Sequence, residues 1–142
     1  MGDTQGTGSQ SVPPHVQLIQ MAVASWVAAT VYAAAKLGVA DHLAAGPKSA
    51  VEVAGTAGVH APSLHRLMRT LAGLGILTER DREQFALTPP GEALKTGAAG
   101  SARATLMAFC GPAFWHSWEE FVYSLETGKT GFEKANGMPL FE

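Results

Sequence analysis

The chain has 142 residues, of which 46% are hydrophobic and 15% charged, and its formal net charge is −2. This composition is typical of a globular protein and excludes an intrinsically disordered chain. The charge balance gives no general attraction to nucleic acid or to an anionic membrane. The single cysteine, Cys110, excludes an internal disulfide framework and fits a cytoplasmic setting. So few charges leave apolar surface that a protein partner is expected to cover.

The first part of the chain predicts a tail and one long helix. Residues 1–12 are rich in Gly, Ser, Thr and Gln and are expected to form a disordered tail. Pro13 and Pro14 predict the start of a helix, and Gly38 predicts its end after Leu37. Apolar side chains occupy nearly every face of this helix: Val16, Leu18, Ile19, Met21, Val23, Trp26, Val27, Val31 and Tyr32. One small domain cannot cover all of them, so the pattern predicts a homodimer.

A membrane span is the alternative interpretation of this helix, because residues 16–35 carry no charge. Alanine, which is only weakly apolar, is the commonest of these residues, and Gln17, Gln20, Ser25 and Thr30 interrupt the run. The N-terminal side lacks the basic residues that flank a span or open a secretory signal. We therefore expect no membrane partner.

The middle of the chain predicts a winged helix-turn-helix. A short helix is expected at 39–45, a helix with a Ser49–Glu52 capping box at 50–57, and another at 61–74. Strands at 76–80 and 84–87 flank a charged turn. The fold class is therefore mainly α, a winged helix-turn-helix dimerisation domain with a small two-stranded β-wing, spanning 13–100.

The remaining segments predict further helices. One is expected from Thr88 to Lys95, followed by a loop at 97–100, and others are expected at 101–109 and 113–126, with a loop from Thr127 onward. Residues 101–142 are interpreted as a helical segment that leads towards a further domain.

The helix-turn-helix raises the possibility of DNA binding, which requires positive charge on the second helix and the wing. The outer face of that helix offers His65, Arg66 and Arg69. The wing segment 79–83 carries three acids and two bases, so it repels phosphate on balance. We expect a structural module and no nucleic-acid partner.

The other motifs point away from catalysis by this chain. Gly128-Lys129-Thr130 resembles the end of a phosphate-binding loop, but Tyr123 stands where that motif needs glycine. The five histidines have no metal-ligand spacing, so no metal site is expected. Cys110 is interpreted as a small hydrophobic residue rather than a nucleophile. We therefore predict no catalytic, metal-binding or cofactor-binding residue here.

An aromatic cluster stands out near the end of the chain: Phe109, Phe114, Trp115, Trp118 and Phe121. Helical spacing places Phe114, Trp118 and Phe121 on one face. Core packing explains such a cluster, and aromatic walls around a flat ligand are the alternative.

Four segments in this order resemble the N-terminal region of the plant-type O-methyltransferases, including the bacterial natural-product members. They are 26–41 (WVAATVYAAAKLGVAD), 61–77 (APSLHRLMRTLAGLGIL), 85–92 (FALTPPGE) and 137–142 (GMPLFE). The resemblance implies an N-terminal domain that builds an intertwined homodimer, followed by a Rossmann-like domain that binds S-adenosylmethionine and holds the catalytic histidine. No Gly-x-Gly-x-x-Gly occurs here, so the chain alone is expected to be inactive and to bind no cofactor.

The resemblance also implies substrate-lining positions. These match Ala108, Phe109, Phe114 and Leu140, and the position on the first helix that reaches the partner's pocket matches Ser25, beside Trp26. The expected parent is a methyltransferase acting on a hydroxyl of an aromatic small molecule. The alternatives are a winged-helix transcription regulator and a stand-alone dimeric protein that binds an aromatic ligand.

Overall fold

The computed structural model describes residues 12–140. Most of the expected tail therefore lies outside the described residues, as do the last two residues of the fourth resembling segment. Thirteen elements follow one another along the described chain: α1 (Pro14–Lys36), α2 (Val39–Leu43), β1 (Lys48–Ser49), α3 (Ala50–Ala57), α4 (Ala61–Gly73), β2 (Leu77–Arg80), η1 (Asp81–Glu83), β3 (Gln84–Leu87), α5 (Pro89–Glu92), α6 (Arg103–Phe109), α7 (Pro112–Glu119), α8 (Phe121–Thr127) and α9 (Gly131–Asn136).

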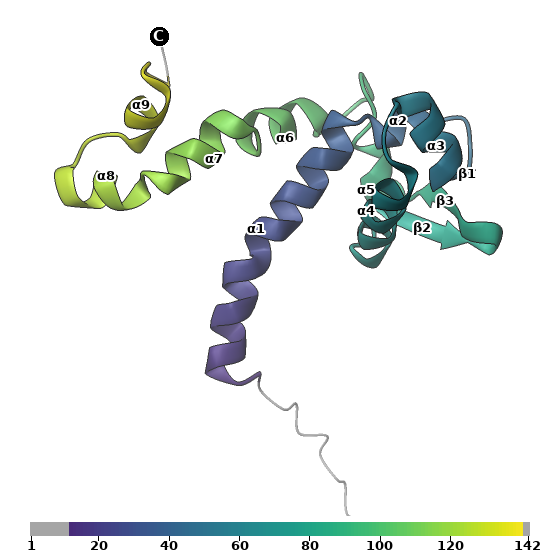
Figure 1. Cartoon of the computed structure of the whole chain (residues 1–142), viewed down its shortest axis with the longest axis horizontal. Helices are drawn as coiled ribbons and strands as arrows, with labels where there is room; N and C mark the ends of the chain where they lie inside the picture. The colour runs from purple at the N-terminus through teal and green to yellow at the C-terminus, as the bar shows by residue number, and fades with distance from the viewer. Residues whose placement is uncertain (1–11, 141–142) are drawn as a thin grey trace, which may run out of the picture.

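The described chain has one compact unit and two arms (Figure 1). Elements α2 to α5 and the three strands form the compact unit, which we call the winged unit. Helix α1 runs away from it as the first arm. Helices α6 to α9 run away in a different direction as the second arm. The two arms diverge from the side of the winged unit where α1 ends and α6 begins.

The winged unit confirms the predicted fold class. Helices α3 and α4 form the helix-turn-helix, and β2 and β3 form the antiparallel wing, with Leu77 opposite Leu87 and Arg80 opposite Gln84. The expectation of two strands was incomplete, because β1 pairs with the other edge of β3 to give the order β1-β3-β2. A strand of two residues has no alternating pattern that a sequence could reveal.

Helix α3 begins as its sequence predicts. The Ser49 hydroxyl accepts a hydrogen bond from the Glu52 N–H at 3.3 Å, and the Glu52 carboxylate accepts from the Ser49 N–H at 2.7 Å. These two bonds form the expected capping box. The hydrogen bonds from Ser49 also lower the pKa of the Glu52 carboxyl.

The hydrophobic core belongs almost entirely to the winged unit. Its buried side chains come from α1's last turns, α2, α3, α4, β2 and β3: Ala34, Val39, Leu43, Ala50, Val53, Ala54, Leu64, Met68, Leu71, Leu77 and Phe85. Helices α6 to α8 contain no buried residue, and α9 contains only Gly131. The arms therefore gain little stability from the core of their own chain.

Gly91 provides a test of the packing between α5 and the wing. A Cβ at Gly91 would lie 2.3 Å from the carbonyl oxygen of Ile76, whereas nothing lies within 4 Å of a Cβ at Gly55 in α3. Gly91→Ala is expected to lower the free energy of unfolding by about 1–3 kcal/mol through overpacking. The matched Gly55→Ala is expected to raise it by up to about 1 kcal/mol, because alanine favours helix. Urea denaturation of both variants measures the two free energies of unfolding. Equal changes in the two variants would contradict the close packing of Gly91 against Ile76.

The second arm differs from the predicted one in two places. The helix expected at 113–126 is broken at Glu120, where φ is −94° and ψ is 14° and the N–H bonds to Ser117, three residues back. The loop expected from Thr127 contains α9, which begins where the Thr130 hydroxyl accepts from the Phe132 N–H. Thr130 and Glu133 have the spacing of a capping box, a signal that could have revealed this helix.

The break and α9 belong together. Lys134 of α9 forms an ion pair with Glu120 at 2.6 Å and lies over the Tyr123 ring, 4.1 Å from its centroid. Gly131 lies close to the backbone of Glu120, because a Cβ at Gly131 would be 3.0 Å from the Glu120 carbonyl oxygen. Helix α9 thus folds back on α7 and α8 at the point where the helix tightens. This contact between distant residues leaves no trace in helical periodicity. The helix expected from Thr88 is also shorter than predicted, since i to i+3 turns replace it after Glu92.

Candidate functional site

The first arm exposes apolar side chains that its own chain does not cover. Only Ala34 and Ala35, near the end of α1, are buried. Further towards the N-terminus, Leu18 is 68% exposed, Met21 70% and Trp26 71%. A helix of 23 residues with large apolar groups on its surface is stable in water only if another surface covers them.

The second arm holds the aromatic cluster, which falls into two groups. Phe114 contacts Phe109 edge to face, with ring centroids 5.1 Å apart, and it also contacts Phe132 of α9 at 5.6 Å. Trp118 contacts Phe121 across the break at Glu120, with centroids 5.6 Å apart. Phe132 was missed by the sequence prediction because its helix was missed.

Asn136 fixes α9 against α7 below these rings. Its side-chain amide donates to the carbonyl oxygens of Ala113 and Phe132, at 3.1 and 3.0 Å, and to the Ser117 hydroxyl at 3.2 Å. The side chains of the aromatic cluster stay largely accessible, since Phe109 is 60% and Trp118 61% exposed. The cluster is therefore an open surface rather than a closed core.

A small recess of about 60 Å³ lies where α1 meets the second arm, lined by Ala28, Phe109, Cys110, Trp115 and Trp118. It is too small for an aromatic ligand, because ligand sites usually measure about 300–1,000 Å³. Cys110 is a half-buried free thiol in this recess, which agrees with its interpretation as a small hydrophobic residue. Within one chain the aromatic cluster thus forms a wall and not an enclosed pocket.

Trp26 lies away from this wall in its own chain. At about 100° per residue, Trp26 is about 200° around the helix from Ala28, which borders the recess. Ser25 lies on the flank nearer to Ala28, and its hydroxyl bonds to the Ala22 carbonyl at 3.2 Å. The indole of Trp26 is therefore available to a second copy of the chain.

The structure brings together only some of the predicted site residues. Phe109 and Phe114 touch, and Ala108 lies exposed beside Phe109 on α6. Leu140 follows α9 and is 41% exposed. The contact of Ser25 and Trp26 with a partner's pocket stays a prediction.

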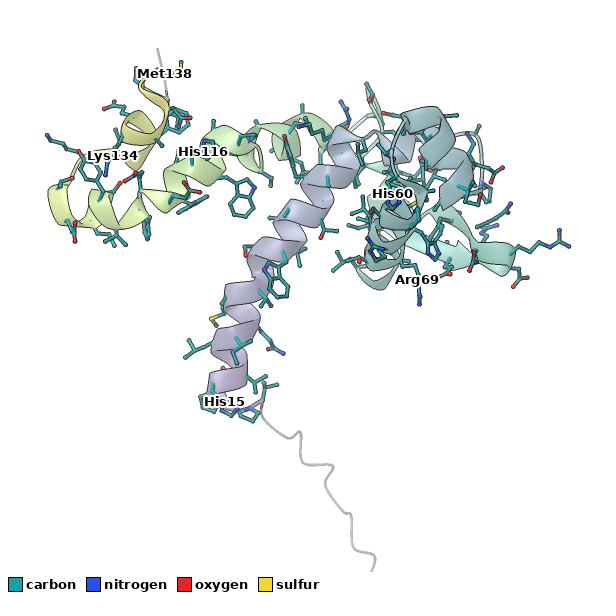
Figure 2. The ribbon with its side chains drawn as sticks, in the orientation of Figure 1. His15, His60, Arg69, His116, Lys134 and Met138 are labelled. Carbon is teal, nitrogen blue, oxygen red and sulfur yellow. The ribbon has the colours of Figure 1, made fainter. Side chains whose placement is uncertain are left out.

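The face of the winged unit that would bind DNA is less basic than its sequence indicates. Arg69 on α4 lies 3.7 Å from the Glu79 carboxylate on the wing. His65 was placed on the outer face, but this was wrong, because the half-buried ring packs against Phe85 with centroids 5.8 Å apart. Figure 2 shows Arg69 beside the wing strands. Arg69 is paired with an acid and His65 is withdrawn from the surface. This face therefore offers little positive charge to bind phosphate.

Duplex DNA is accordingly expected to bind poorly. Fluorescence anisotropy with a labelled duplex should show no saturable binding at ~0.15 M salt, because the acids and bases of this face nearly balance and give no strong attraction to phosphate. Weak binding at low salt alone would agree with this prediction. A Kd tighter than about 1 µM at ~0.15 M salt would contradict it.

Length and composition alone would allow α1 to cross a membrane, the one helix of the described chain of which this is true. Helices that dock on another protein pass the same test. Gln17 and Gln20 on its surface favour a protein partner, because unpaired amides are costly in hydrocarbon.

Comparison with known proteins identifies the family of the chain. The sequence model of the O-methyltransferase dimerisation domain matches residues 19–97, from the second turn of α1 to the loop after α5. This chain belongs to that family. The match includes the exposed apolar part of α1 and the whole winged unit.

Relatives extend the similarity into the second arm. A phenazine O-methyltransferase of Lysobacter antibioticus is 36% identical over 138 residues, which are 97% of this chain and 40% of that protein. The crystal structure of N,N-8-amino-8-demethyl-D-riboflavin dimethyltransferase from Streptomyces davawensis matches with a TM-score of 0.84 and 32% identity, over 92% of this chain and 39% of that one.

A third relative was solved with S-adenosylhomocysteine (SAH) bound. It is CalO1, a methyltransferase in calicheamicin biosynthesis, with a TM-score of 0.77 and 32% identity, over 92% of this chain and 40% of that one. The chain thus spans about two fifths of the length of the relatives it matches.

Proposed function

We propose that this chain forms the dimerisation and substrate-pocket part of an S-adenosylmethionine-dependent O-methyltransferase that acts on an aromatic small molecule. The observation that carries the proposal is the first arm, whose apolar surface is exposed in the part that matches the dimerisation family. A second copy of the chain has the same arm, so two arms can cover each other about a twofold axis. The interface would exceed roughly 2,000 Å² in total, as in other obligate dimers.

The same packing would complete the substrate pocket. The wall formed by Phe109 and Phe114 is open in one chain, and Trp26 lies on the side of α1 turned away from it. When two chains intertwine, Trp26 of one copy can close the pocket over Phe109, Phe114 and Leu140 of the other. Flat aromatic molecules stack well between such side chains. Ser25 and Ala108 would line the edges of this pocket.

We infer that the methyl donor binds outside the part of the chain that the structure describes. In Rossmann-like domains, the cofactor binds where a parallel strand leads through a glycine-rich loop into a helix. The described sheet is antiparallel and three-stranded, and its longest strands have four residues. The donor would therefore bind in another part of the protein, and the described residues would contribute orientation of the acceptor rather than proton transfer.

Trp26→Ala tests the pocket in a methyltransferase that contains this chain. The KM for the aromatic acceptor is expected to rise at least about tenfold, because buried tryptophans commonly contribute this much to binding. The affinity for the methyl donor is expected to stay unchanged. Steady-state kinetics with each substrate varied in turn measures both.

Val51→Ala is the matched control, since Val51 is 70% exposed and lies on the winged unit. It should change neither constant. An unchanged acceptor KM in Trp26→Ala would remove Trp26 from the pocket and return it to the dimer interface.

A further inference from the structure

Three side-chain hydrogen bonds join distant parts of the chain, and all three lie where the arms diverge. Asp41 of α2 accepts from the Thr96 N–H and from the Thr96 hydroxyl, each at 2.7 Å. Arg103 donates through Nε to the carbonyl oxygen of Ala35 at 2.9 Å. Every other side-chain hydrogen bond among the described residues joins positions at most 23 apart. We call these four residues the arm joint.

Arg103 links the end of one arm to the beginning of the other. Ala35 lies in the last turn of α1, where its carbonyl oxygen accepts a 3.3 Å turn bond from the Gly38 N–H in place of a helical one, and Arg103 is the first residue of α6. A guanidinium donor on the C-terminal end of a helix forms a charge-assisted bond that the helix dipole strengthens. Ala35 is only 1% exposed, so water competes little for this carbonyl group.

Asp41 links α2 to the loop before α6. Burial alone would raise the pKa of the Asp41 carboxyl, but hydrogen bonds from Thr96 and the nearby charges of Arg103 and His42 hold it below its ordinary value. The carboxyl is therefore ionised at neutral pH and accepts both bonds from Thr96. Together the two links fix α6 relative to α1 and α2.

Beyond the joint the two arms still touch as far as Ala28 of α1, and their free ends lie apart (Figure 2). A Cβ at Gly111 would lie 3.7 Å from the Tyr32 ring, and the small recess at Ala28 lies further along α1. Figure 2 shows His15 at the free end of α1, far from Lys134 and Met138 at the end of the second arm. At about 1.5 Å per residue α1 is about 35 Å long, so a rotation of about 10° at the joint moves its free end by about 6 Å.

We propose that Asp41 and Arg103 are positioning residues that fix the angle between the two arms. In the dimer this angle would set the distance between Trp26 of one copy and Phe109 and Phe114 of the other, without either positioning residue touching the substrate. The consequence for the pocket rests on the proposed function. The links that fix the angle lie within one chain.

Distance measurements between spin labels test the angle in the full chain. Cysteines replace His15 on the first arm and Glu126 on the second, both exposed, and Cys110→Ser removes the native thiol. The labelled chain is diluted into a large excess of unlabelled chain before refolding, so that most dimers carry one labelled copy. The parent protein should give one narrow distance distribution.

Loss of a link should change this distribution. Arg103→Met and Asp41→Ala, which removes both acceptors of the Thr96 bonds, are expected to double its width at least, or to shift its maximum by several ångströms. Arg103→Lys should restore part of the narrow distribution, because its amino group can still donate to Ala35. Arg80→Met, on the exposed wing, is the matched control and should change nothing.

An unchanged distribution in folded Arg103→Met and Asp41→Ala would overturn the proposal. If Arg103→Met does not fold, Thr96→Val removes one hydroxyl donor only, and an unchanged distribution in both Thr96→Val and Asp41→Ala would overturn the proposal in the same way. Equal broadening by lysine and methionine at position 103 would assign the effect to lost packing and would also overturn it. The mass of the same samples shows whether the chain is a dimer. A monomer mass would therefore count against the proposed function, whereas the distance distribution tests only the angle between the arms.

Discussion

Val27→Asp is expected to convert the dimer of this chain into monomers. Val27 lies in the middle of α1 and is 44% exposed in the single chain. Trp26 and Met21 on the same helix are also exposed. In the proposed dimer each copy would bury this carboxylate without a partner, a change that typically costs about 3–5 kcal/mol. The dimerisation constant should therefore weaken at least about a hundredfold, since 1.4 kcal/mol corresponds to a factor of ten.

Val51→Asp is the matched control for this variant. It makes the same chemical change at a valine that is 70% exposed on α3 in the winged unit. Analytical ultracentrifugation of both variants over a range of concentrations separates an effect on the interface from a general effect on solubility. Equal weakening by both substitutions, or by neither, would remove α1 from the dimer interface.

Phe85→Ala is expected to cause the largest loss of stability within the winged unit. Phe85 is fully buried on the central strand β3, opposite Lys48 of β1 and Glu79 of β2, and its ring contacts His65. Replacing a buried phenylalanine with alanine costs about 3–5 kcal/mol, through lost burial and the cavity that remains. Small domains have only about 5–15 kcal/mol in total, so much of the variant should be unfolded at modest urea concentrations.

Leu74→Ala is the control, because Leu74 follows α4 and is 41% exposed, and its substitution should cost less than about 1 kcal/mol. Urea denaturation must be compared at one protein concentration, since the stability of a dimer depends on it. A loss below about 1 kcal/mol in Phe85→Ala would contradict the central position of this ring.

The elements that local sequence signals determine were predicted well. Helix α1 begins after Pro13 and ends before Gly38, and α3 begins with the Ser49–Glu52 capping box. Strands β2 and β3 flank the charged turn as predicted, and Arg82 and Glu83 in this turn have positive φ values of 61° and 57°. Caps and turns act over a few residues, which is why a sequence alone reveals them.

The elements that distant contacts determine were predicted poorly. The break at Glu120 arises where α9 folds back and Lys134 binds the carboxylate of Glu120. The bonds from Thr96 to Asp41 join residues 55 positions apart. No periodic pattern records such pairs. The aromatic cluster was predicted in part for the same reason, since its members Phe109 and Phe114 were named from the sequence and Phe132 was not.

The measurement that tests the account most directly is the mass of the unmodified chain in solution. The central claim is that a second copy covers the exposed apolar surface of α1, because its own chain leaves Leu18, Met21 and Trp26 uncovered. Light scattering coupled to size-exclusion chromatography at micromolar concentration should give twice the chain mass of 14.8 kDa, unchanged on dilution across the column. A mass of 14.8 kDa, from a chain whose circular dichroism shows it to be folded, would contradict the claim.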